Sequence, residues 1–334
     1  MLWSKTLKLK HPPSLLPNHL PPRSTPRQDN GNSLETTKIT MKKLLPKIVS
    51  NSMRVAAVMV AIATGTASVA AQDNGSDGNV ARPVKSIFTS DVGTVAMQDT
   101  YLSPITYKGT NLRLGYQHMQ ALGHDPERWV RSLDLGMEYD NVHNIVGNNT
   151  MHGLYIDARW ALMRRWRDVI VPGLQLMGGG AAMMHGGVIY NPRNSNNICS
   201  VKVHAGIGIA GCATYPVKIG KLPVTLSYQM SAPVIGAFYS PDYDESYYEI
   251  YVGNHSGLVH VAWPGSRLEI NNLVSADLRL GSTILRLGYR HHGMSSSINN
   301  LTTRHSSHAL VIGLGGDFLS VGAKTPPARI VTAF

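Results

Sequence analysis

Residues 201–209 read VKVHAGIGI, a stretch in which apolar side chains alternate with polar or small ones. Because successive side chains of a β-strand point to opposite faces, this period of two predicts a strand with one apolar face. The same alternation recurs in 111–118, 133–139, 154–162, 222–230, 285–290 and 310–318. A helix would need a period of 3.6 residues, which these stretches do not show. The sequence therefore predicts an all-β protein.

The alternating runs divide the chain into ten expected strands, with a range of 8–12. Their expected bounds are 85–98, 108–120, 128–141, 151–163, 168–182, 199–214, 222–236, 270–281, 282–293 and 304–318. A tilted transmembrane strand needs about 9–11 residues. The expected strands are therefore long enough to cross a bilayer.

The links between the expected strands differ in length from one end of the barrel to the other. Links 121–127, 164–167, 215–221 and 281–282 are short. Links 142–150, 183–198, 237–269 and 294–303 are longer or more polar, and link 99–107 is intermediate. This asymmetry is typical of outer-membrane barrels. We therefore predict an antiparallel transmembrane β-barrel of meander topology, with short periplasmic turns, longer outer loops and both termini in the periplasm.

The long link 237–269 leaves the number of strands open. Its segments 248–251 and 258–261 flank a turn-forming stretch and are compatible with a hairpin. A hairpin in the wall would raise the count to twelve strands. A link folded into or over the barrel would leave ten.

The net charge of +11 comes mainly from the N-terminal segment. Residues 1–71 contain ten of the 31 Lys and Arg residues but only two of the 20 Asp and Glu residues. The basic charge therefore gives no reason to expect a nucleic-acid partner. Within this segment, residues 41–71 combine a basic start, a short apolar run and a small-residue end, which is the pattern of a signal peptide cleaved near Ala71.

The expected domain organisation follows from this pattern. Residues 1–40 are either a disordered extension or the product of a start codon read too far upstream, 41–71 are the signal peptide, and 72–84 are a flexible lead-in. Residues 85–318 form the barrel, and 319–334 form a C-terminal tail. The expected location is the outer membrane, with the periplasm or secretion as the alternative. The expected partners are outer-membrane lipid and the barrel-assembly machinery, while any small solute or surface ligand is unidentified.

Three segments carry a resemblance to a known family. They are Tyr101–Gly109 (YLSPITYKG), the hairpin Ala276–Gly293 and the strand Ala309–Phe318 (ALVIGLGGDF). Over about residues 85–318 the chain resembles an uncharacterised family of Gram-negative, Bacteroides-type outer-membrane β-barrels. The resemblance implies location and architecture, and it carries no catalytic assignment.

The polar face of the alternating strands would line the lumen if the apolar face meets lipid. The predicted lumen-lining cluster is Arg113, Arg131, Asp134, Glu138, Asp157, Arg159, Lys202, His204, Asp277, Arg279, Arg286, Arg290 and Asp317. Both signs of charge are present, and we expect them to pair because an unpaired buried charge is costly. Side chains largely fill the interior of so small a barrel. The sequence therefore predicts a largely plugged polar lumen.

The predicted function is that of an integral outer-membrane protein of unknown specific role, either structural or a narrow porin-like channel. A soluble secreted or periplasmic β-barrel binding protein is the first alternative, because alternation alone does not say which face is outside. An outer-membrane hydrolase is the second. Its candidate residues are the loop acids Asp242, Asp244 and Glu245 with His255 or His260.

No catalytic residue, cofactor or metal site is predicted. His291 and His292 are adjacent, so on a strand their side chains face opposite sides and cannot jointly bind a metal there. The same argument applies to His305 and His308, which differ in parity.

The two cysteines are not expected to form a disulfide. Cys199 and Cys212 lie at opposite ends of one expected strand. At about 3.3 Å per residue their separation is about 43 Å, far beyond the span of a disulfide.

Overall fold

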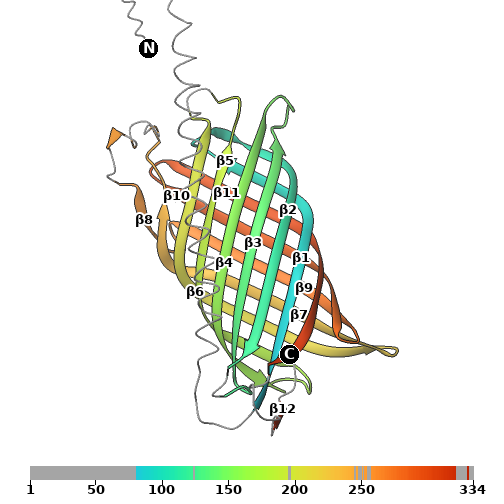
Figure 1. The fold of residues 1–334 in the computed structure, drawn as a ribbon. Helices are drawn as coiled ribbons and strands as arrows, with labels where there is room; N and C mark the ends of the chain where they lie inside the picture. The colour runs from blue at the N-terminus through green and yellow to red at the C-terminus, as the bar shows by residue number, and fades with distance from the viewer. Residues whose placement is uncertain are drawn as a thin grey trace, which may run out of the picture. The chain divides into compact units, whose positions relative to one another are not determined.

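The alternating stretches form ten long strands that make the wall of a barrel (Figure 1). The computed structural model describes residues 80–122, 125–194, 197–243, 246, 250, 252–253, 257–320 and 329–330. The wall strands are β1 (Val80–Asp99), β2 (Ser103–Ala121), β3 (Trp129–His143), β4 (Thr150–Arg167), β5 (Gln175–Tyr190), β6 (Cys199–Ile219), β7 (Leu222–Tyr239), β9 (Arg267–Leu280), β10 (Thr283–Ile298) and β11 (Leu301–Ser320). Two short strands complete the sheet: β8 (Val259–Ala262) and β12 (Arg329–Ile330).

The barrel is closed by the first and last wall strands. Each wall strand pairs antiparallel with the next one along the chain, and β1 pairs antiparallel with β11 from Arg82↔Ser320 to Asp99↔Thr303. Closure leaves neither the first nor the last wall strand as a free sheet edge, as a sheet in lipid requires. The prediction of an antiparallel meander barrel is therefore confirmed.

The strand count is ten because β8 and β9 share one place in the wall. Strand β7 pairs with β9 as far as Ser231↔Asn271 and with β8 from Gly236↔Ala262 onward. The turn 263–266 separates the two segments, with the amides of Ser266 and Arg267 donating to the Trp263 carbonyl. In the described part of the chain, the link after β7 thus adds one strand segment rather than a wall hairpin.

Several predicted strand boundaries differ from those in the structure, and two of the differences have clear local reasons. The fifth strand begins at Gln175 rather than at 168, because residues 168–174 form a turn in which Asp168 and Gly173 have positive φ. The expected loop 294–303 is a two-residue turn at Asn299 and Asn300, both with positive φ. Two such residues form the hairpin turn that matches strand twist, so β10 and β11 continue almost to its tip.

The loop asymmetry is correspondingly weaker than predicted. At one end of the barrel the links are 100–102, 144–149, 191–198, 240–258 and 299–300. At the other end they are 122–128, 168–174, 220–221 and 281–282. Only 191–198 and 240–258 exceed the longest links of the opposite end. We call the first end the loop end and the second the turn end.

The outward face of the wall is apolar. Nine of the ten wall strands place a large apolar side chain, 44–70% exposed, on this face. These residues are Phe88, Leu112, Met137, Leu154, Ile207, Leu226, Val274, Leu287 and Leu310. Water-soluble monomers rarely expose a continuous apolar surface of this extent, whereas an outward apolar band is characteristic of transmembrane barrels. Among the described residues, no helix is long and apolar enough to cross a membrane.

The predicted terminal segments are largely untested. The expected extension 1–40, the signal peptide 41–71, and most of the lead-in 72–84 and the tail 319–334 lie outside the described residues. Within the described part, β12 pairs in parallel with the start of β1 through Val80↔Arg329 and Ala81↔Ile330.

Candidate functional site

The inward face of the wall carries a network of ion pairs. At its centre, Lys85 and Arg286 both contact the carboxylate of Asp277. The Lys85 Nζ lies 2.5 Å from Asp277 Oδ2, while Arg286 donates two hydrogen bonds, of 2.7 Å and 2.9 Å, to the same carboxylate. All three side chains are at most 5% exposed. Arg286 also donates to Gln117 Oε1 at 2.7 Å, which links β10 to β2 across the interior.

Further pairs fill the middle of the barrel. Arg113 donates from Nη2 to both carboxylate oxygens of Asp157, at 2.9 Å and 2.7 Å. A Cβ at Gly136 would overlap the Arg113 guanidinium, which explains why glycine stands on the inward face of β3. Three more pairs are Arg159–Asp134 at 2.8 Å, Arg290–Asp91 at 2.6 Å and Arg279–Asp317 at 3.0 Å.

Histidines and carboxylates gather nearer the loop end. The His305 Nε2 lies 2.8 Å from Asp140 Oδ2 and 3.4 Å from Glu138 Oε1. The amide of Asn111 donates to both acids at 2.7 Å. His292 packs beside His305, with 5.4 Å between the ring centroids. Ligand atoms of Glu138, His292 and His305 all lie within 4.8 Å of one another, so this group can hold a metal ion.

Inward charges of the two signs balance. On the described strands, nine Lys or Arg side chains at inward positions are buried or half-buried: Lys85, Arg113, Arg159, Arg165, Lys202, Arg267, Arg279, Arg286 and Arg290. Nine acids match them: Asp91, Asp99, Asp134, Glu138, Asp140, Asp157, Glu269, Asp277 and Asp317. Such balance is what a low-dielectric interior requires, since every unpaired charge would carry its full desolvation penalty.

Twelve of the thirteen predicted lumen residues occupy inward positions of their strands. Arg113, Glu138, His204, Asp277 and Arg286 are buried, and the other seven are half-buried. Arg131 is the exception. It has the outward parity of Leu133 and Leu135 on β3, and it hydrogen-bonds Gln120 on the outward face of β2. Its assignment to the lumen was wrong, because it lies an odd number of positions from inward-facing Asp134, so the two side chains lie on opposite faces of β3.

Several interior residues escaped the sequence analysis. They are Lys85, Asp91, Asp99, Asp140, Arg165, Arg267 and Glu269, together with the histidines at 185, 292 and 305. The inward face of β1 mixes Lys85 and Asp91 with apolar Ile87 and Val95, so no apolar–polar period is visible there. Every second residue counted from a known inward residue of a strand also points inward. Applying this rule along each strand would have identified these residues.

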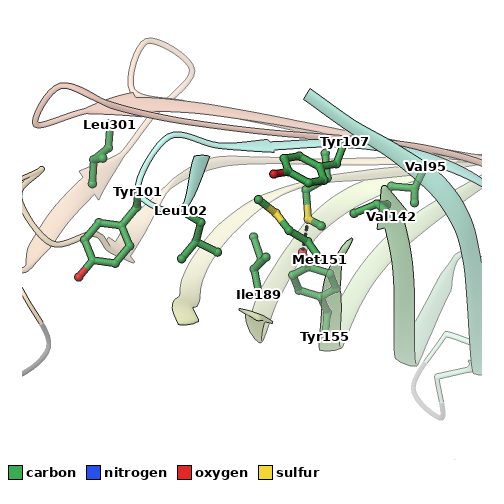
Figure 2. Packing of buried hydrophobic residues seen from close by; sticks show 10 residues of the cluster. Val95, Tyr101, Leu102, Tyr107, Val142, Met151, Tyr155, Ile189 and Leu301 are labelled. Carbon is green, nitrogen blue, oxygen red and sulfur yellow. Dashed lines mark hydrogen bonds between the residues drawn. The ribbon is translucent and has the colours of Figure 1, made fainter. Parts of the chain in front are cut away.

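Apolar clusters lie on either side of the ion-pair network. The loop-end cluster comprises Val95, Met97, Tyr101, Leu102, Tyr107, Val142, Met151, Tyr155, Ile189 and Leu301 (Figure 2). Within it, the Tyr155 hydroxyl donates to the Met97 sulfur at 3.2 Å. The turn-end cluster comprises Met119, Val130, Ala161, Met163, Met177, Ala181, Ala210 and Cys212. Large side chains therefore occupy the interior towards both ends.

One interior cavity has a volume of about 70 Å³. It lies in the ion-pair network and is lined by residues that include Arg113, Glu138, His185, Glu269 and His292. A buried water needs about 10–15 Å³ of such volume. The cavity therefore has room for a few water molecules.

The enzyme candidates fall partly outside the described residues. Asp244, Glu245 and His255 are not described, and Asp242 is exposed. His260 contacts the Ser240 carbonyl at 3.0 Å and the Asn299 amide at 3.2 Å. Both cysteines lie on β6 and are free.

Comparison with solved structures gives distant similarity to bacterial barrels. The chain is similar to the translocator domain of the autotransporter NalP from Neisseria meningitidis, at 14% identity and a TM-score of 0.34, covering 80% of this chain and 98% of that one. It is also similar to the transport unit of the autotransporter AIDA-I from Escherichia coli, at 8% identity and a TM-score of 0.40, covering 75% and 93%. The outer membrane protease OmpT from Escherichia coli gives 8% identity, a TM-score of 0.37, and coverage of 71% and 97%.

Comparison with families gives a match over most of the chain. No curated protein matches. The family described as "Protein of unknown function (DUF3316)" matches residues 55–325. The predicted resemblance to an uncharacterised family is confirmed, while the Bacteroides-type origin stays a prediction. The chain belongs to the DUF3316 family, whose function is unknown.

Proposed function

We propose that this chain is an integral outer-membrane protein whose barrel is closed to solutes and which serves a structural, non-catalytic role in the envelope. The proposal includes export by the signal peptide 41–71, cleavage near Ala71 and insertion by the barrel-assembly machinery. The apolar outward face supports a lipid environment.

The main support for a closed lumen is that ion pairs cross the interior between two apolar clusters. Arg286 joins Asp277 on the neighbouring strand to Gln117 on β2, and Gln117 in turn donates to Gln229 on β7 at 2.7 Å. These contacts tie together strands from different sides of the wall. A hydrated solute would have to separate them, and separating a buried ion pair costs several kcal/mol.

Planar-bilayer recording of the purified full chain tests this proposal. We expect no stable conductance steps, and no swelling of sugar-loaded liposomes, because ion pairs and two apolar clusters occupy the interior. A sixteen-stranded porin in the same bilayers serves as the positive control. The folded state is checked by the shift in electrophoretic mobility between unboiled and boiled samples. Large, long-lived conductance steps from the folded protein would refute the closed lumen and favour the channel alternative.

A further inference from the structure

The histidine–carboxylate group at the loop end has the composition of a metal site. Glu138 comes from β3, His292 from β10 and His305 from β11, so three strands contribute one ligand each. One carboxylate with two imidazoles is a donor set used for Zn²⁺ in proteins. Imidazole also favours zinc, copper, iron and nickel over magnesium and calcium.

The spacing of the donor atoms suits a tetrahedral ion. Ligands bound at about 2.0–2.1 Å in tetrahedral geometry lie about 3.3–3.4 Å from one another. The His305 Nε2 and Glu138 Oε1 are 3.4 Å apart. Zinc bound at this nitrogen would replace its contact with Asp140 Oδ2, which is 2.8 Å long. The ligand atoms of all three residues lie within 4.8 Å of one another, so His292 is close enough to supply the third ligand.

The charges around the cluster favour a cation. Asp99 pairs with Lys202 at 2.9 Å, and Glu269 pairs with Arg267 at 2.6 Å. Among the described residues, the nearest Lys or Arg nitrogen to the Glu138 carboxylate is Arg113 Nε at 3.9 Å, and that arginine is already engaged by Asp157 at 2.7 Å.

Asp140 adds a second carboxylate at this level of the interior. It is fully buried and is contacted by the Asn111 amide at 2.7 Å and the His305 imidazole at 2.8 Å. Glu138 and Asp140 therefore place two carboxylates beside the His305 ring, and a divalent ion there would offset their charge.

Outer contacts would hold the ligands in place. Asn111 donates to Glu138 Oε1 at 2.7 Å, and Glu269 Oε1 lies 3.4 Å from His292 Nε2. A carboxylate beside a metal-binding imidazole orients the ring and raises its basicity.

We propose that Glu138, His292 and His305 bind one Zn²⁺ ion inside the barrel. Glu138 and His292 also line the interior cavity, which provides room for a water molecule as the fourth ligand. The ion would link β3 to the β10–β11 hairpin across the interior and so stabilise the folded barrel.

Metal stoichiometry tests the proposal on the full chain, purified without a histidine tag and stripped with a chelator. After equilibration with Zn²⁺ and dialysis, we expect one zinc per chain. Co²⁺ substitution should give the intense visible absorption of a tetrahedral site. Glu138→Gln and His305→Ala should each weaken zinc affinity by about 100-fold or more. The absence of stoichiometric zinc in the folded wild-type protein would overturn the proposal.

The matched control is the double variant His291→Ala/His308→Ala. These two histidines lie on the same strands but at outward positions, with 4.8 Å between ring centroids. The control variant should bind zinc as the wild type does. Loss of zinc binding in this variant would place the ion on the outward face and contradict the proposal. If the ligand variants fail to fold, X-ray absorption spectroscopy of the zinc-loaded wild-type protein and of the control variant tests the site instead. Two imidazole ligands per zinc ion in both proteins would support the site. A zinc coordination shell without imidazole would refute it.

Discussion

Asp277→Asn is expected to lower the free energy of unfolding by about 3–5 kcal/mol, the usual cost of removing one partner from a buried ion pair. The substitution preserves side-chain volume, so it creates no cavity. It leaves Lys85 and Arg286, which are 4% and 1% exposed, without the carboxylate that both contact. Urea unfolding in lipid vesicles, followed by tryptophan fluorescence, measures the change.

The control is the same substitution at the turn-end rim. Asp125 lies 3.8 Å from the Nε of Arg128, whose side chain is 67% exposed. Exposed pairs of this kind contribute about 0–1 kcal/mol, so Asp125→Asn should be nearly neutral. Adding Lys85→Met to Asp277→Asn should recover part of the loss, since one of the two unpaired cations is removed. Equal effects at Asp277 and Asp125 would contradict the ion-pair network.

Leu310→Lys is expected to destabilise the membrane-inserted barrel by about 2–4 kcal/mol, the cost of a lysine on the lipid-facing side near the bilayer midplane. Leu310 lies at the middle of β11, is 70% exposed and pairs with outward-facing Val92. Reversible folding into phosphatidylcholine vesicles measures the difference.

Ile145→Lys serves as its control. Ile145 is 97% exposed in the 144–149 loop at the loop end, where a charge meets water. This variant should fold like the wild type. If Leu310→Lys were equally neutral, the outward face would be in contact with water, as in the soluble alternative.

The barrel could be predicted from sequence because alternation is a local property. On β6, the stretch 201–209 places only apolar residues outward and only small or polar residues inward, so the period of two is plain. On β1 it is hidden, since Ile87 and Val95 face inward beside Lys85 and Asp91. The fifth strand was misplaced because the exposed apolar residues of 169–171 resemble a strand, although Pro172 and Gly173 make them part of a turn.

The histidine cluster could not be predicted from parity alone. The prediction that His291 and His292 face opposite sides agrees with the structure, and so does that for His305 and His308. What brings His292 to His305 is the register of β10 on β11, where His292 pairs with Ser307, two residues from His305. Glu138 joins them only because the barrel closes through β1. Register and closure are properties of the whole wall, and a single strand does not reveal them.

The contact of the outward face with lipid is tested most directly by spin labels at Val92, Leu112 and Leu310 in a Cys199→Ser/Cys212→Ala background. In the barrel reconstituted in bilayers, we expect labels at these three exposed positions to collide with oxygen and to be shielded from a water-soluble nickel reagent. A label at Ile145 should show the reverse. Nickel accessibility at Val92, Leu112 and Leu310 equal to that at Ile145 would contradict a barrel that spans the membrane.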